Sequence, residues 1–386
     1  MRTVSKRVFS LLAAALLAAP AFAADPIKIG VYGPFSGGSS PMGLSMRNGV
    51  RLAADEINAK GGVLGRKIEL VDRDDQAVNE RGAQVMQDLV SNEKVSAVLG
   101  PINTGVALAS YKYPMEAKVP LLINVSAGAP VNELFKDYPD NYVFRLAAGD
   151  PIQAEMIVSE GVDKRKFKKV AVLCDDTNYG QNGRQKMEDA LAARKVTPVY
   201  IGKFKIKDTD MTPQLQEARK AGAEAILTYG IGPELAQLAN GMQKLGWKVP
   251  MIGSWTLSMS NFIDAAGPNG DGATMPQTFI QAGASTAKAK QFIADYQKKF
   301  TVERIPSAVA AAQGYDSMYV LAQAIEQAGG TEGPKIKASL EDLKKPYAGV
   351  IATWAKPFSK TDHEAIHREH VVMGVVGKGE VLPPAK

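Results

Sequence analysis

Short, β-rich apolar runs alternate along this chain with longer segments of helical periodicity, and this alternation restricts the possible folds more than any other feature. The first apolar runs cover residues 27–32, 68–71, 95–99 and 121–125. The helical segments between them cover residues 46–59, 83–90 and 107–117. Such alternation predicts β-α-β units, and therefore a parallel sheet with helices on both faces.

A second series of the same kind begins near Asp150. Its apolar runs and helical segments cover residues 170–174, 180–193, 199–204, 213–221, 225–229, 233–245 and 251–254. After a loop at 267–276, helices at 288–300 and 307–327 are expected to return to the first half. A mature chain of about 360 residues is too long for one hydrophobic core. The sequence therefore predicts an α/β protein with two Rossmann-like lobes, each built on a parallel sheet, joined by a hinge.

The N-terminus has the three-part pattern of a secretory signal peptide. Arg2, Lys6 and Arg7 precede an apolar run at 8–19, and the small-x-small triplet Ala21-Phe22-Ala23 follows it. The run has about a dozen residues, whereas a membrane-spanning helix needs roughly 20. We expect residues 1–23 to be removed on export and the mature protein to reach the periplasm.

Charge and cysteine content exclude several classes of function. The formal charge of +6 falls to about +3 without the signal peptide, and both signs are interleaved, so nucleic acid is not an expected partner. The only cysteine, Cys174, lies far from the cleavage site. A lipid anchor on an N-terminal thiol, an intramolecular disulfide and a cysteine-based zinc cluster are therefore all excluded.

The predicted topology also indicates where a ligand would bind. In open parallel sheets, ligands bind at the carboxyl ends of the strands, where helix N-termini point their free N–H groups. The segments that follow the predicted strands are 34–43, 100–105, 124–130, 175–180, 230–233 and 253–257. We expect them to face a cleft between the lobes.

Four segments of the chain carry a resemblance to a known family. They are Gly33-Pro34-Phe35-Ser36-Gly37, then 58–66, which reads Asn-Ala-Lys-Gly-Gly-Val-Leu-Gly-Arg, then Asp74-Asp75-Gln76 and Val98-Leu99-Gly100-Pro101. In order and spacing they resemble the leucine/isoleucine/valine-binding family of type I periplasmic binding proteins. The resemblance covers essentially the whole mature chain.

The family resemblance implies both an architecture and a set of partners. Three crossover strands would join an N-terminal lobe (24–147 plus 278–352) to a C-terminal lobe (148–277 plus 353–386). The lobes would close over a small ligand, without a cofactor. The partners implied are an inner-membrane ABC permease and its ATPase, and the protein itself would be a monomer. A sensory binding module would share the same fold and pocket.

The resemblance also assigns a carboxylate grip to two segments. In Asn103-Thr104-Gly105, a hydroxyl and backbone N–H groups at a helix start would receive the ligand carboxylate. In Ser126-Ala127-Gly128, backbone groups would do the same from the next strand end. The alternative is that Thr104 and Ser126 only cap their helices, as hydroxyl residues often do.

Further ligand contacts follow from the same resemblance. Tyr179 matches an aromatic residue that closes over the ligand, and Ile231 lies where the family often has tyrosine. Met42 stands where an aromatic residue is common and would give an adaptable lining. Tyr315 matches another aromatic residue near the pocket, although an aromatic residue at helical spacing can equally belong to the core.

One position departs from the family pattern in a way that affects the ligand. Amino-acid binders carry a glutamate after the strand at 251–253, and it pairs with the ligand ammonium; this chain has Trp255 there. A buried ammonium without a counter-charge costs several kcal/mol. The sequence therefore favours a bulkier or aromatic acid, for which Trp255 would offer a flat wall.

An enzyme motif offers a competing interpretation. His363-Glu364-Ala365-Ile366-His367 has the H-E-x-x-H pattern of zinc proteases, in which two histidines on one helix face hold the metal. An exported zinc hydrolase is therefore the alternative function. The segment lies near the C-terminus, before a strand-like run at 371–376, so we expect a solvated loop, no metal, and a binding protein rather than an enzyme.

Overall fold

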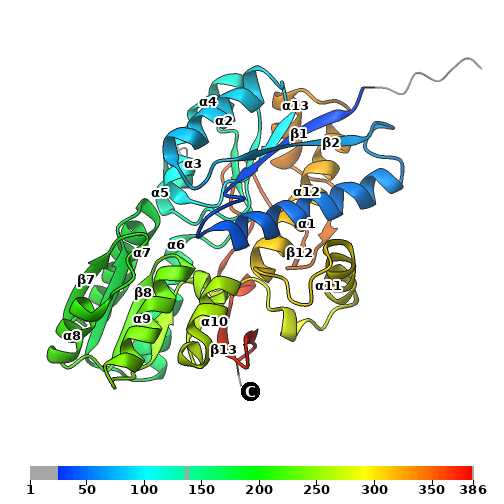
Figure 1. Cartoon of the computed structure of the whole chain (residues 1–386). Coiled ribbons are helices and arrows are strands. Elements are labelled where there is room, and N and C mark those ends of the chain that lie inside the picture. The colour runs from blue at the N-terminus through cyan, green and yellow to red at the C-terminus, as the bar shows by residue number, and fades with distance from the viewer. Residues whose placement is uncertain (1–24, 135–137, 139, 385–386) are drawn as a thin grey trace, which may run out of the picture.

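Two sheets, each covered by helices, form two lobes that lie side by side (Figure 1). The computed structural model describes residues 25–134, 138 and 140–384. The predicted signal peptide lies outside the described residues. Within the described part, no helix is long and apolar enough to cross a membrane. The α/β fold predicted from the alternation is confirmed.

The first lobe is built on a five-stranded sheet with the order β2-β1-β3-β4-β5, in which every pairing is parallel. Its strands are β1 (Ile27–Gly33), β2 (Ile68–Asp74), β3 (Ala97–Leu99), β4 (Leu121–Ile123) and β5 (Val143–Arg145). The strand order reverses between β1 and β3. Ligands of open parallel sheets bind at such a reversal.

Helices from two distant parts of the chain cover this first sheet. The early ones are α1 (Ser40–Ala59), α2 (Asn79–Ser91), α3 (Thr104–Ser110), α4 (Lys112–Ala117) and α5 (Ala129–Glu133). The late ones are α11 (Ala287–Phe300), α12 (Ala308–Ala328) and α13 (Gly333–Leu340), followed by the hairpin of β11 (Tyr347–Ala348) and β12 (Thr353–Trp354). The two sets meet because α12 packs along α1 (Figure 1).

The second lobe has a seven-stranded sheet with the order β14-β13-β10-β9-β8-β6-β7. Its parallel strands are β6 (Val170–Asp175), β7 (Tyr200–Phe204), β8 (Ala225–Tyr229), β9 (Met251–Gly253) and β10 (Thr274–Gln277). Two antiparallel strands extend one edge, β13 (Val372–Gly377) and β14 (Glu380–Leu382). The strand order reverses between β6 and β8, which defines a second point for ligand binding.

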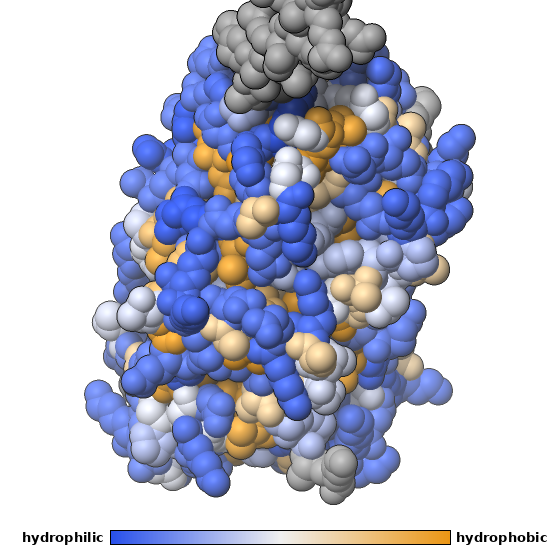
Figure 2. Space-filling model, turned by 90° about the vertical axis from the view of Figure 1, so that its right-hand side faces the viewer, coloured by the Kyte–Doolittle hydropathy of each residue, from blue (hydrophilic) through white to orange (hydrophobic). Residues whose placement is uncertain are grey.

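The helices of the second lobe come mainly from the middle of the chain. The α-helices are α6 (Asp150–Val158), α7 (Asn178–Ala193), α8 (Thr212–Lys220), α9 (Gly232–Lys244) and α10 (Ser260–Ala266). A π-helix, η1 (Ser159–Lys164), continues α6, and the short 3-10 helices are η2 (Trp255–Ser258), η3 (Gly267–Gly270), η4 (Gln281–Gly283) and η5 (Arg368–His370). Strand residues such as Leu173 and Leu227 are fully buried beneath these helices. Hydrophilic residues predominate on the outer face shown in Figure 2.

Two predicted elements differ from the structure, and each difference involves a proline. The helix predicted over 107–117 is divided into α3 and α4, because the ring of Pro114 would clash with the carbonyl of Ser110 four residues earlier. The loop predicted over 267–276 contains η3 and the start of β10. Pro276 lies inside that strand, where proline is unusual and hides the strand signal.

The segment with the H-E-x-x-H pattern is extended, and it passes between the lobes. Its backbone pairs with β5, since the Arg145 amide donates to the His363 carbonyl at 2.8 Å and the Ala365 amide donates to the Arg145 carbonyl at 2.9 Å. Ala365 and Ile366 are buried. The prediction of a solvated loop is therefore wrong here: the segment packs as a crossover strand.

Candidate functional site

A cavity between the lobes is lined by residues that follow strands of both sheets. The first lobe contributes Ser39, Met42, Ile102, Asn103, Val125 and Ala127, and the second contributes Tyr179, Ile231, Trp255, Thr256 and Met259. About 300 Å³ of empty space is present, including space that opens to solvent. Six predicted site residues lie on its wall, namely Met42, Asn103, Ala127, Tyr179, Ile231 and Trp255.

An open groove adjoins this cavity and contains two more predicted residues. Thr104 and Gly105 line the groove together with Asn103 and Tyr179, which also line the cavity. The first turns of α2 and α7 form the rest of its wall, so the groove has one side on each lobe. The two hollows therefore adjoin each other at Asn103 and Tyr179.

Several polar side chains around this site are buried without a hydrogen-bond partner. The atoms concerned are Asn103 Oδ1, Thr104 Oγ1, both side-chain polar atoms of Asn124, Ser126 Oγ, Asp150 Oδ2 and the Tyr179 hydroxyl. Buried polar atoms are nearly always bonded, because each unmade bond costs about 1–3 kcal/mol. Of these residues, Asn103, Thr104 and Tyr179 line the two hollows, where their polar atoms are available to a polar ligand group.

The same observation tests whether two hydroxyls cap their helices. Thr104 is the first residue of α3, and Asn103, at the N-cap, makes no side-chain capping bond. Neither the Thr104 nor the Ser126 hydroxyl bonds any group among the described residues. The capping interpretation is therefore wrong for both residues.

The backbone of 126–128 is less available than the family resemblance implies. The Ser126 amide donates to the Pro101 carbonyl at 3.1 Å, so it is not free to receive a carboxylate. The hydroxyl of Ser126 remains the donor at this position. Gly128 lies against Thr104, because a Cβ atom there would stand 2.2 Å from Thr104 Cγ2. Only glycine permits this approach.

Aromatic side chains from the second lobe form the opposite wall. Trp255 begins η2 directly after β9 and is 2% exposed. Its amide donates to Gln153 Oε1 at 3.2 Å, which attaches η2 to α6. The ring of Tyr179, in the first turn of α7, lies 4.7 Å from that of Tyr229. Trp255 and Tyr179 thus give the second lobe's side of the cavity an aromatic wall.

Asp150 lies next to the cavity, because its amide donates to the carbonyl of Ala127 on the cavity wall, and the sequence did not indicate it. Its carboxylate is fully buried and accepts a hydrogen bond from the Tyr229 hydroxyl at 2.6 Å. Burial raises the pKa of Asp150 to about 6, although the Tyr229 bond and the nearby Arg145 oppose that shift. In the sequence Asp150 only precedes a helix-starting proline. Its position after β5, at the junction of the lobes, was the available signal.

Tyr315 lies away from the cavity, in contrast to the expectation from the resemblance. It belongs to α12, and its hydroxyl donates to Glu56 of α1 at 2.7 Å and accepts from Lys288 of α11 at 2.8 Å. Its ring packs on Phe292. These contacts are those of a core residue that holds three helices together, so Tyr315 is removed from the candidate site.

The zinc-hydrolase alternative finds no support in the geometry. His363 and His367 are not on a helix, and the His363 ring stacks on Phe144 with 4.0 Å between ring centroids. Glu364, the base in such enzymes, is paired with Arg145 instead. Across the described ranges, no group of three His, Cys, Asp or Glu side chains could hold a metal ion.

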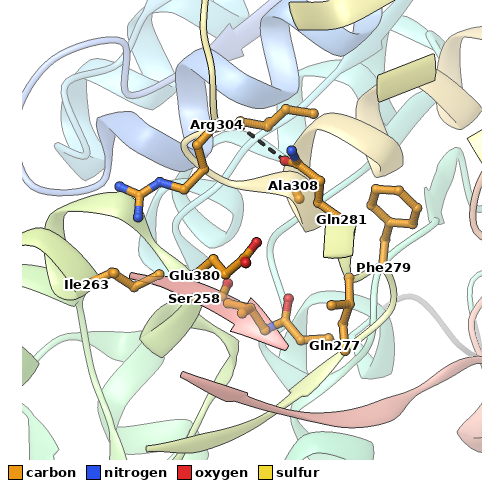
Figure 3. Close-up of a pocket in the computed structure, with 11 residues that line it drawn as sticks. Ser258, Ile263, Gln277, Phe279, Gln281, Arg304, Ala308 and Glu380 are labelled. Carbon is orange, nitrogen blue, oxygen red and sulfur yellow. Dashed lines mark hydrogen bonds between the residues drawn. The ribbon is translucent and has the colours of Figure 1, made fainter. Parts of the chain in front are cut away.

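A second cavity lies where α10, the segment after β10 and β14 approach the start of α12 (Figure 3). Its wall includes Ser258, Gln281, Arg304 and Glu380. The Ile305 amide donates to Gln281 Oε1 at 3.3 Å across it. None of the predicted site residues lines this cavity, so we assign it no ligand.

Comparison with known proteins agrees with the two-lobed geometry. The profile of a family described as periplasmic binding protein matches residues 26–379. The chain belongs to this family. The Leu/Ile/Val-binding protein BraC3 of Rhizobium johnstonii is 29% identical over 341 residues, which are 88% of this chain and 90% of the relative. A leucine-, isoleucine-, valine-, threonine- and alanine-binding protein of Pseudomonas aeruginosa is 27% identical, covering 86% of this chain and 87% of its own.

A solved structure of another protein has the same architecture as this periplasmic binding protein. It is the branched-chain amino acid transporter substrate-binding protein LivJ of Streptococcus pneumoniae in complex with isoleucine. The two chains share 27% identity and superpose with a TM-score of 0.81 over 93% of this chain and all of LivJ. The resemblance seen in the sequence is confirmed, and so is the prediction of a substrate-binding protein rather than an enzyme.

Proposed function

We propose that this protein is the binding component of an ABC importer for a small, hydrophobic nutrient that bears a carboxylate. The observation that carries the proposal is the division of the interlobe site into two halves. The first lobe holds the buried, unpartnered hydroxyls of Thr104 and Ser126, and the second lobe contributes the apolar side chains of Ile231 and Trp255 to the cavity wall. The names of the two relatives, which bind leucine, isoleucine and valine and in one case also threonine and alanine, support this ligand class.

The ligand carboxylate would bind first to the first lobe. Hydrogen bonds from neutral hydroxyls to a charged oxygen are stronger than those between neutral groups. Tyr179, Ile231 and Trp255 would then enclose the apolar part as the second lobe closes. The width of Trp255 favours a large aliphatic or aromatic side chain on the ligand.

Closure would be the signal that the importer recognises. We propose lobes at 24–147 plus 278–352 and at 148–277 plus 353–386, which rotate about the segments that cross between the sheets. The closed form would dock on an inner-membrane permease that an ATPase drives. Export through a cleaved signal peptide, residues 1–23, would deliver a monomer to the periplasm.

A thermal-shift screen of the exported protein tests this function. The panel contains aliphatic amino acids, aromatic amino acids, aromatic carboxylates, amides and urea. A ligand at about 100 times its Kd stabilises the folded protein by roughly 2.7 kcal/mol, which is a rise of several degrees in Tm. We expect such a rise with at least one carboxylate. Stabilisation by amides or urea alone would refute the proposed ligand class.

A further inference from the structure

Two buried glutamines bond the backbone of Trp255, one on each side of that residue. The Trp255 amide donates to Gln153 Oε1 at 3.2 Å, and the Trp255 carbonyl accepts from Gln277 Nε2 at 3.3 Å. Gln153 is 0% exposed and Gln277 is 1% exposed. Burying a carboxamide costs free energy unless its polar atoms are bonded, and a methionine would fill a similar space without that cost. The bonds to Trp255 therefore offset a penalty that an apolar residue would avoid.

Gln153 also bonds a segment that connects the two lobes. It lies in the first turn of α6, and its Nε2 donates to the Ala148 carbonyl at 2.9 Å. Ala148 lies where the chain leaves β5 of the first sheet and enters α6 of the second lobe. The start of this connection is bonded to the first sheet, because the Leu146 amide donates to the Ile123 carbonyl at 2.8 Å. One carboxamide thus joins Trp255 to the connection.

Gln277 lies at a second connection between the lobes. It is the last residue of β10, after which the chain returns to the helices of the first lobe. The Oγ1 atom of the next residue, Thr278, accepts from Gln313 Nε2 of α12 at 3.3 Å. Gln277 and Ser258 lie on the wall of the second cavity (Figure 3), and the Ser258 hydroxyl donates to the Trp255 carbonyl at 2.6 Å. The Trp255 carbonyl is therefore bonded to a residue beside this connection.

The Trp255 ring has no hydrogen bond of its own to fix it. Trp354 is buried like Trp255, but its Nε1 donates to the Ala365 carbonyl at 2.8 Å. Among the described residues, no such bond holds the Trp255 ring. The position of that ring therefore depends on its backbone and on the residues that anchor the backbone.

We propose that Gln153 and Gln277 are positioning residues, which couple the Trp255 ring to two segments that connect the lobes. The proposal rests on the proposed function, in which Trp255 contacts the ligand and the lobes rotate about these segments. Neither glutamine lines the cavity, so each acts on the ligand through Trp255. When the lobes rotate, the two carboxamides would move the aromatic wall together with the connecting segments. A wall that is already in place loses little freedom when the ligand binds, which strengthens binding.

A double-mutant cycle tests whether the glutamines act through Trp255. The probes are L-leucine, L-phenylalanine, 3-phenylpropanoate and benzoate, titrated calorimetrically into the exported protein, and the cycle uses the one that binds most tightly. Gln153→Met should weaken that probe by about 3- to 10-fold, as expected for the loss of one buried hydrogen bond. Trp255→Leu should weaken it by about 2- to 10-fold. In the Trp255→Leu protein, Gln153→Met should add less than about a twofold change, because the ring that it positions is absent.

A second glutamine variant and a control complete the test. Gln277→Met should give the same pattern in the same cycle, and it replaces Gln153→Met if that variant does not fold. Gln327→Met is the control, because the Gln327 carboxamide bridges the Lys344 amide and the Asp342 carbonyl, at 2.8 and 3.0 Å, away from the site. It should leave Kd unchanged.

Three outcomes would overturn the assignment of the glutamines. The first is equal weakening by the glutamine substitutions with and without the Trp255 ring, since this would show a general structural role. The second is unaltered affinity in both folded glutamine variants, and the third is unaltered affinity in Trp255→Leu. If the wild type binds none of the four probes, the proposed ligand class itself is refuted, and this outcome is distinguishable because it involves no variant.

Discussion

Residue by residue, the site is distinguished by what its polar groups leave unbonded. Thr104 and Ser110 lie on the same short helix, α3, and both are fully buried. The Ser110 hydroxyl bonds the Val106 carbonyl at 2.7 Å and the Tyr32 hydroxyl at 2.8 Å. The Thr104 hydroxyl bonds nothing among the described residues. The Ser110 hydroxyl stabilises the fold, and the Thr104 hydroxyl is available to a ligand.

Replacing these two hydroxyls should therefore have opposite effects. Thr104→Val keeps the shape and removes an unsatisfied group, so the ligand-free protein should be as stable as the wild type or more so. Ligand affinity should fall by about 10–100-fold, because a hydrogen bond to a charged group contributes roughly 1.5–3 kcal/mol. Ser110→Ala should lower Tm and leave Kd unchanged. Unaltered affinity in Thr104→Val would contradict the carboxylate assignment.

At the scale of elements, the sequence predicted what depends on local periodicity and missed what depends on partners. The alternating runs located the strands and helices of both sheets, because buried parallel strands are continuously apolar. The H-E-x-x-H segment was missed as a crossover strand, since its pairing with β5 involves residues more than 200 positions away. Asp150 was missed for the same reason, because its partner Tyr229 comes from another strand.

The pairing of that crossover strand with β5 gives an element-scale prediction. Arg145 is almost fully buried, and Glu364 is its ion-pair partner in the crossing segment. Glu364→Gln would leave the guanidinium without a counter-charge, which should lower the free energy of unfolding by about 2–3 kcal/mol. Urea denaturation of the variant and the wild type measures this change in the free energy of unfolding. Glu332→Gln, at the exposed pair with Lys335, is the control and should cost less than about 0.5 kcal/mol. If Glu364→Gln and Glu332→Gln lower the free energy of unfolding equally, the buried pair does not stabilise the crossing segment.

At the scale of the whole molecule, polar contacts join the two lobes. Asn261 of α10 donates from Nδ2 to the carbonyl of Gly38, just before α1, at 2.8 Å. On another side, Arg304 bonds Asp264 at 2.6 Å and the Gly379 carbonyl. Ligand affinity depends on how often the closed form is populated, since a ligand can stabilise that form only by the contacts it makes there. Contacts between the lobes therefore contribute to affinity without touching the ligand.

Asn261→Ala should reveal this contribution, because Gly38 lies next to Ile231 and Pro233 across the cleft. Loss of one hydrogen bond, about 0.5–1.5 kcal/mol, should weaken ligand binding by roughly 2- to 10-fold, mainly through faster dissociation. Asn240 makes the same kind of bond, to the Ala265 carbonyl at 3.0 Å, but within the second lobe. Asn240→Ala should therefore alter Tm and leave the dissociation rate unchanged. If stopped-flow measurements show equal rates for the two variants, the Asn261 contact does not stabilise the closed form.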